Sequence, residues 1–138
     1  MFRFVVCHLR WLARVPGLPQ YFDTMLLTWT ALFHRRRLRA MEAIEEATLQ
    51  MPGVRLCVHR LGGMEFVCGE RELGHLHGNG LLDVRVGMDE ARVIVRDGLA
   101  GPHHVFGESA WVSFWVRGME DVQGAVELLE KARDANSS

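Results

Sequence analysis

The hydrophobic pattern of this chain changes its period at Met51-Pro52-Gly53. Before this break, Leu38, Met41, Ile44 and Leu49 recur with the spacing of an amphipathic helix, which predicts a helix over residues 38–50. After it, apolar and polar residues alternate from residue 54 to residue 59, the pattern of a half-buried strand. A chain that contains both periods requires a mixed fold, in which helices pack on a sheet.

The rest of the sequence extends this mixed pattern. Further strand-like segments span residues 64–68, 71–77, 82–86 and 111–117, and helical segments span residues 21–34, 88–99 and 118–133. Residues 102–110 are expected to form a loop. Short spacing between strands, with glycine-rich turns, favours an antiparallel meander. We therefore expect an α+β fold: a two-layer sandwich with a mainly antiparallel sheet of about five strands, helices on one face, and additional N-terminal helices.

The chain is expected to divide into an N-terminal helical arm, residues 1–37, and an α+β domain, residues 38–138. The arm ends in the basic run Arg35-Arg36-Arg37, while the remainder of the chain is acidic. Its apolar run Met25–Phe33 has nine residues, whereas a membrane-spanning helix needs roughly twenty. We expect a cytoplasmic protein whose N-terminal helices are candidates for a peripheral membrane contact or a homodimer interface. Docking of the arm onto the acidic remainder is the alternative, and the acidic body argues against nucleic-acid binding.

The alternation assigns opposite characters to the two faces of the predicted sheet. The apolar face, which helices would cover, collects Val54, Leu56, Val58, Leu82, Val84, Val86, Val112, Phe114 and Val116. The other face collects His59, His75, His77, Asp83, Arg85, Trp111, Ser113 and Trp115. Polar, charged and aromatic groups that converge on one face predict a small-molecule site there.

Histidines carry the strongest functional signal on this face. His75 and His77 are two residues apart, so on a strand both imidazoles point the same way. An unperturbed imidazole titrates near pH 6.5 and can exchange a proton at neutral pH. We expect catalytic roles for His75, His77, Asp83 and His104, with Asp83 orienting an imidazole. The alternative is that these side chains only hydrogen-bond to one another within a polar sheet face.

A second group of residues is expected to bind the substrate. It comprises His103, Arg85, Trp111, Ser113, Trp115 and Glu65. Arg85 can hold an acidic oxygen, and the two tryptophans can stack on a flat ring. The tryptophans can equally fill space between sheet and helix, and Arg85 can equally keep the face soluble.

A metal site is the alternative use of the histidines. His75, His77 and His104 can supply three nitrogen ligands, with a carboxylate as a fourth. The sequence contains no helical Glu-x-x-His or His-x-x-x-His pattern among these residues, which argues against a metal site.

Several blocks in order resemble the luciferase-domain family. They are Leu61-Gly62-Gly63-Met64-Glu65-Phe66, then the segment 74–83 with its His-x-His-Gly, then Pro102-His103-His104-Val105, then 109–114 with Trp-Val-Ser-Phe. The resemblance covers roughly residues 38–132, and the combined order is more specific than any single piece. It implies the family's fold and pocket. Fungal members oxidise a hydroxylated pyrone with molecular oxygen, so the resemblance also implies cofactor-free oxygen chemistry.

Two functions are consistent with these observations. The first is a cofactor-independent, oxygenase-like enzyme that acts on a planar enol or pyrone-type small molecule. The second is a non-catalytic module that binds a small molecule or a protein through the histidine face. A closed site with His75, His77 and Asp83 in mutual contact favours the enzyme, and a flat exposed face favours the module.

Overall fold

The computed structural model describes residues 17–59 and 63–136, and this part of the chain forms four α-helices and one six-stranded sheet. The strands are β1 (Val54–Val58), β2 (Met64–Cys68), β3 (Arg71–Leu76), β4 (Leu81–Arg85), β5 (Gly101–His103) and β6 (Gly107–Trp115). The helices are α2 (Leu18–Phe33), α3 (Arg35–Leu49), α4 (Met88–Arg96) and α5 (Val122–Asn136), with a short 3-10 helix η2 (Met119–Asp121) before α5. Residues 1–16 of the predicted arm lie outside the described residues.

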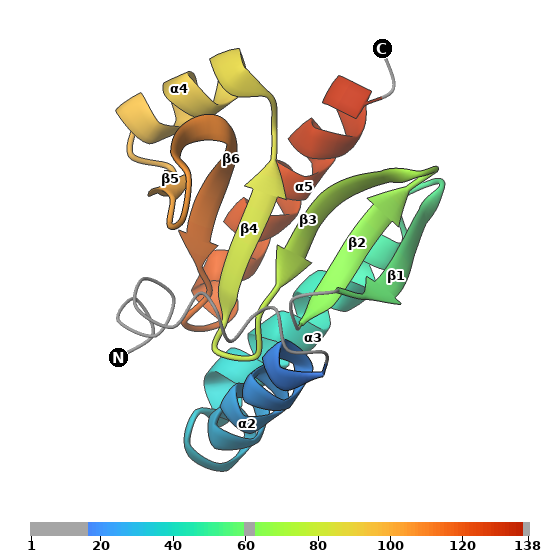
Figure 1. Ribbon diagram of the computed structural model, residues 1–138, viewed down its shortest axis with the longest axis vertical. Helices are drawn as coiled ribbons and strands as arrows, with labels where there is room; N and C mark the ends of the chain where they lie inside the picture. Colours follow the sequence, from blue (N-terminus) through green and yellow to red (C-terminus); the bar gives the residue numbers. More distant parts are fainter. Residues whose placement is uncertain (1–16, 60–62, 137–138) are drawn as a thin grey trace.

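The sheet has the strand order β1-β2-β3-β4-β6-β5, and every neighbouring pair is antiparallel. Helices α3 and α5 lie across one face of it, while α2 packs beside α3 (Figure 1). This arrangement confirms the predicted α+β sandwich with a mainly antiparallel sheet and N-terminal helices. It also places the strand β4 inside the sheet, between β3 and β6.

The core forms between the apolar sheet face and the helices. Leu82, Val84, Val112 and Val116 are fully buried there, as the alternation predicts. Val58 is the exception, because it lies at the end of the edge strand β1 and is 72% exposed. The prediction that Val58 contributes to the core is therefore wrong.

The predicted loop over residues 102–110 is also wrong. This segment contains β5 and the start of β6, which form a hairpin. Pro102 hides the strand from sequence analysis, because proline lacks a backbone N–H and disfavours a central strand. Here β5 is an edge strand of the described sheet that pairs only with β6, so the N–H that Pro102 lacks is not needed for hydrogen bonds to a strand on its other side. The hairpin matters for function because it carries His103 and His104 to the sheet.

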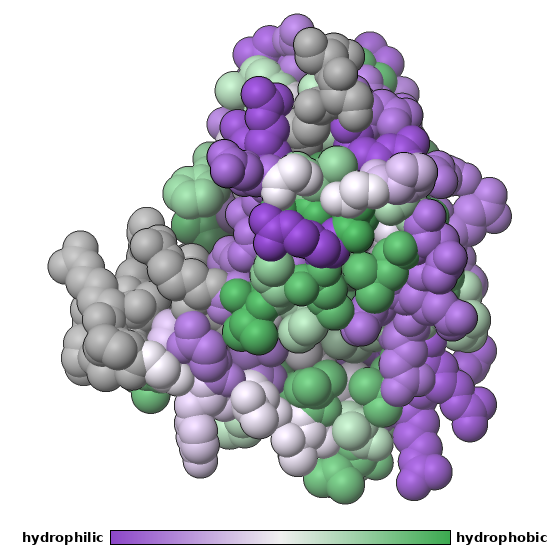
Figure 2. Space-filling view, turned by 90° about the vertical axis from the view of Figure 1, so that its right-hand side faces the viewer, coloured by the Kyte–Doolittle hydropathy of each residue, from purple (hydrophilic) through white to green (hydrophobic). Residues whose placement is uncertain are grey.

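Helix α2 is partly docked and partly exposed. It buries Asp23 and Thr30 and leaves Met25, Trp29 and Phe33 more than half exposed. Among the described helices, none combines the length and the apolar composition needed to cross a bilayer. On the face of the molecule where β1 lies, hydrophobic side chains gather in the centre (Figure 2).

Candidate functional site

Asp83 lies at the centre of the polar sheet face. It is directly opposite His75 on β3 and Ser113 on β6. Because residues directly opposite each other on neighbouring antiparallel strands point to the same face, the sheet register alone brings these three side chains together. Asp83 is completely buried, and a buried carboxylate is stable only when partners compensate its charge.

One carboxylate oxygen of Asp83, Oδ1, faces the β5–β6 hairpin. The Ser113 hydroxyl donates a hydrogen bond to it. Nδ1 of His104 lies 3.2 Å from the same oxygen and 3.4 Å from Ser113 Oγ. Nε2 of His103 lies farther away, at 3.9 Å. Asp83, Ser113 and His104 therefore form a compact cluster, in which the carboxylate and the hydroxyl orient the imidazole.

The other oxygen of Asp83, Oδ2, faces the β3 histidines. Nε2 of His75 and Nε2 of His77 each lie 3.4 Å from it. The two imidazole planes are nearly perpendicular, at 89°. Within residues 17–59 and 63–136, no donor meets Oδ2 in hydrogen-bonding geometry. Both imidazole nitrogens are thus farther from Oδ2 than the donor of a charge-assisted hydrogen bond would be.

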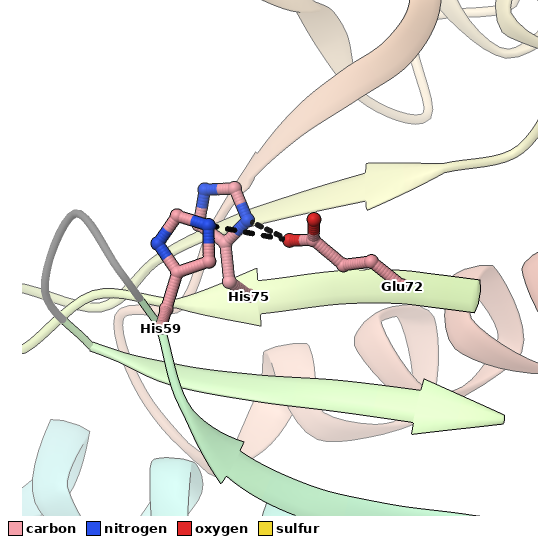
Figure 3. A group of neighbouring side chains, drawn as sticks. All are labelled: His59, Glu72 and His75. Atoms are coloured by element: carbon pink, nitrogen blue, oxygen red, sulfur yellow. Dashed lines mark hydrogen bonds and ion pairs between the residues drawn. The ribbon is translucent and has the colours of Figure 1, made fainter. Parts of the chain in front are cut away.

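Glu72 holds the far side of His75. Its Oε1 lies 2.6 Å from His75 Nδ1 and 3.6 Å from His59 Nε2. The rings of His59 and His75 stack, with centroids 4.1 Å apart, and both point a nitrogen at the same carboxylate oxygen (Figure 3). His75 therefore bridges two carboxylates, Glu72 through Nδ1 and Asp83 through Nε2.

Asp23 of α2 reaches the site from the N-terminal side. Its Oδ1 accepts a hydrogen bond from the Gly78 backbone N–H at 2.8 Å and lies 3.8 Å from His77 Nδ1. The Thr30 hydroxyl donates to the Gly78 carbonyl at 2.7 Å. A Cβ at position 78 would lie 2.6 Å from the Leu27 backbone nitrogen, so only glycine permits this approach of α2.

Burial and charge act in opposite directions on His75 and Asp83. Burial by itself lowers the pKa of His75, but the carboxylates of Asp83 and Glu72 outweigh it and raise that pKa to about 9. Burial by itself raises the pKa of Asp83, but the neighbouring imidazoles of His104, His75 and His77 hold it far below its usual range. At neutral pH Asp83 is therefore ionised and His75 is protonated.

The other two histidines with shifted pKa values differ from each other. Burial lowers the pKa of His77, but Asp23 and Asp83 more than compensate, and the net shift is upward. Burial together with the neighbouring imidazoles lowers the pKa of His103 to about 4. Nδ1 of His103 accepts hydrogen bonds from the backbone N–H groups of Val105 and Phe106. That nitrogen is a lone-pair acceptor, so the ring is neutral with its proton on Nε2.

The expected substrate-binding residues are divided by the structure. Ser113 and His103 contact the Asp83 cluster, and Trp111 lies beside it, with its ring centroid 5.6 Å from that of His75. Glu65 is opposite His75 across the β2–β3 ladder. Trp115 and Arg85 are on the same sheet face, but both are exposed.

Sequence analysis missed two carboxylates, Glu72 and Asp23. Glu72 is three residues before His75, a spacing that places strand residues on opposite faces. The β2–β3 register shifts at this point, so that Phe66 pairs with Gly74, Val67 pairs with Glu72, and Leu73 is an extra residue. This β-bulge returns Glu72 to the face of His75. Asp23 is 55 residues from Gly78 in sequence, and only the docking of α2 reveals its role.

Among the described residues, the buried and half-buried histidine and carboxylate side chains include three groups that could hold a metal ion. They are His59, Glu72 and His75; His75, His77 and Asp83; and Asp83, His103 and His104. In each group the nearest ligand atoms lie within 4.8 Å of one another. The structure therefore places His75 and His77 beside Oδ2 of Asp83, whereas His104 lies beside Oδ1 of the same carboxylate.

A cleft lies beside the Asp23–Gly78 contact. It has a volume of about 310 Å³ and is lined mainly by apolar side chains of α2, α3 and the ends of β1 to β3. Leu27, Leu38, Met41 and Leu76 contribute to its wall, together with Asp23. The cleft is at the lower end of the size range of small-molecule pockets.

Comparison with known proteins is consistent with the resemblance noted from the sequence. Residues 70–132 match the family model of the luciferase domain, which confirms that resemblance. The matched segment contains β3 to β6, and with them His75, His77, Asp83, His104 and Ser113. Comparison with curated proteins and with solved structures yields no match.

Proposed function

From the match of residues 70–132 to the luciferase-domain model, we propose that this chain is an oxygenase-like enzyme that acts on a planar, electron-rich enol or pyrone. The observation that carries the proposal is the contact between Oδ1 of the buried Asp83 carboxylate and Nδ1 of the half-buried His104, at 3.2 Å. A buried carboxylate that orients an imidazole is a general arrangement for proton transfer.

His104 is assigned as the base. When Nδ1 carries a proton toward Asp83, Nε2 is the basic nitrogen of the neutral ring. Ser113 lies within hydrogen-bonding distance of both groups and helps to fix the ring orientation. His75 is less suited to this role, because its pKa of about 9 means that it already holds a proton at neutral pH. His103 is less suited because its Nδ1 accepts two backbone hydrogen bonds.

The proposed reaction needs only two reactants, the substrate enol and molecular oxygen. His104 removes the acidic proton of the enol, and the electron pair of the resulting anion forms a carbon–oxygen bond to O₂. The peroxide anion then takes the proton back from His104, so the substrate is oxidised and O₂ is reduced to a hydroperoxide. Positive charge near His75 would favour the anion, because a preorganised charge acts strongly in a buried site.

Oxygen consumption tests this proposal. Purified protein is incubated with a panel of hydroxypyrones and related cyclic enols in an oxygen electrode, beside His104→Gln, Asp83→Asn and the exposed-site control His34→Gln. We expect uptake with at least one compound, and a loss of about 10²- to 10⁴-fold in kcat for His104→Gln with little change in KM. His34→Gln should match the unmodified protein.

Absence of uptake across the panel would contradict the proposal. If calorimetry then showed that a compound binds without being turned over, the result would favour the non-catalytic binding module instead. Uptake that survives His104→Gln would retain the enzyme but reject His104 as its base.

A further inference from the structure

We propose that His75 Nε2, His77 Nε2 and Asp83 Oδ2 bind one divalent transition-metal ion. The inference deepens the proposed function, because the ion would supply positive charge at the same site. It rests on the proposed function only for the substrate enolate that the metal ion would bind. The arrangement of the three ligand atoms does not depend on the reaction.

The distances fit a metal better than they fit direct ion pairs. Metal bonds to imidazole nitrogen and carboxylate oxygen are about 2.0–2.2 Å long, so two ligands of a tetrahedral ion are about 3.4 Å apart. Both imidazole nitrogens are 3.4 Å from Asp83 Oδ2. A charge-assisted N–H···O bond would bring them to about 2.7–2.9 Å.

Burial supports the same conclusion. Asp83 is completely buried, and among the described residues no donor reaches its Oδ2 in hydrogen-bonding geometry. A buried carboxylate oxygen normally has such a partner. A cation between the three ligand atoms would provide one.

The outer shell also has the form found around metal-binding histidines. Such histidines present one ring nitrogen to the ion and the other to a carboxylate or carbonyl. His75 directs Nδ1 to Glu72 at 2.6 Å, and His77 directs Nδ1 toward Asp23 at 3.8 Å. Both rings therefore already have the orientation in which Nε2 is the ligand nitrogen.

The donor set defines the class of ion. Two imidazoles and one carboxylate, with no thiolate among them, suit zinc, iron(II), cobalt(II) or manganese(II) better than copper(I) or calcium. Three protein ligands leave at least one coordination position for an exogenous group, as in catalytic sites. An enolate oxygen is a suitable occupant of that position.

Metal binding is measured directly. The full chain is stripped with a chelator, dialysed and titrated with Co²⁺ and Zn²⁺, with calorimetry for stoichiometry and visible absorption for the Co²⁺ coordination. We expect one ion per chain, absorption bands of four- or five-coordinate Co²⁺, and a rise in Tm with Zn²⁺.

Three variants and one control test two of the ligands and the outer shell. His75→Gln and Asp83→Asn should each weaken Co²⁺ binding by at least 100-fold, and Glu72→Gln by about 10- to 100-fold through the outer shell. His34→Gln removes an exposed histidine and should bind as the unmodified protein does. Circular dichroism shows whether each variant is folded. If His75→Gln and Asp83→Asn do not fold, Glu72→Gln still tests the site, because it retains all three ligands.

The inference is rejected if the unmodified protein binds neither ion, or if binding is the same in His75→Gln, Asp83→Asn and Glu72→Gln. Metal binding without oxygen uptake would uphold the site and contradict the proposed function. Oxygen uptake by the chelator-treated protein, in the absence of any metal binding, would support the proposed function and reject the metal site.

Discussion

Asp23 of α2 accepts a hydrogen bond from the backbone N–H of Gly78, and this contact joins the N-terminal helix to the turn that follows His77. The match to the luciferase-domain family model begins at residue 70, so Asp23 lies outside the matched segment. The same carboxylate faces Nδ1 of His77. Helix α2 thus contributes the Asp23 carboxylate to the candidate site as well as packing beside α3.

Gly78→Ala should separate α2 from the site. The added Cβ would lie 2.6 Å from the Leu27 nitrogen and 2.7 Å from the Asp23 carbonyl oxygen, both backbone atoms. We expect the free energy of unfolding to fall by about 2 kcal/mol, as for other substitutions that force backbone shifts. Urea denaturation measures this loss. Gly101→Ala is the matched control, because its Cβ would meet an ordinary contact at 3.6 Å.

Asp83→Asn should destabilise the protein and lower the pKa of His75. Breaking a buried ion pair leaves uncompensated charge and costs about 3 kcal/mol or more. Chemical denaturation gives the stability, and an NMR titration of His75 gives the pKa, which should fall from about 9 toward 6.5. Asp97→Asn removes a carboxylate from an exposed pair with Arg96 and should change stability far less, because solvent screens an exposed ion pair. An unchanged His75 pKa in Asp83→Asn would contradict the described contact.

Stability of the metal-free protein should be greatest near pH 6.5. His75 has a folded pKa of about 9, above the ordinary imidazole value of 6.5, so its contribution is present below pH 6.5 and is lost as the pH rises through 9. His103 has a folded pKa of about 4, so its contribution is present above pH 6.5 and is lost as the pH falls through 4. Thermal unfolding at a series of pH values in a chelating buffer should show both limbs. A curve that keeps rising from pH 6.5 to 9 would contradict the assignment for His75.

The exposed side of α2 should bind anionic membrane surfaces. Met25, Trp29 and Phe33 are 53%, 58% and 61% exposed, and Arg35 and Arg36 follow directly at the start of α3. Aromatic side chains next to basic ones favour an interfacial position on anionic lipid. Vesicle flotation should show binding to phosphatidylserine-containing vesicles and not to neutral ones. Trp29→Asp should abolish it with only a small loss of stability, since the Trp29 side chain is more than half exposed.

Sedimentation of the same two proteins distinguishes this surface from a dimer interface. If the unmodified chain does not float with vesicles but sediments as a dimer that Trp29→Asp dissociates, the apolar side of α2 is a self-association surface. If neither result appears, the exposed side chains have neither role.

The hydrophobic pattern of the chain was sufficient to predict the α+β class, the apolar face of the sheet and the common direction of His75, His77 and Asp83. These features follow from local periodicity, because a strand fixes which side chains share a face. The β5 strand could not be predicted in this way. Its Pro102 is tolerated because β5 is an edge strand, and the position of a strand in the sheet depends on tertiary pairing, not on the local sequence.

Which carboxylates surround the histidines depends on how the strands and helices pack. A bulge at Leu73 moved Glu72 to the face of His75, and the docking of α2 brought Asp23 to His77. This packing also divided the cluster, with His104 at one oxygen of Asp83 and the β3 histidines at the other. Electrostatic interactions depend on distances of a few ångströms between residues far apart in the chain, so the pKa values of these groups follow from the folded arrangement and not from their order in the sequence.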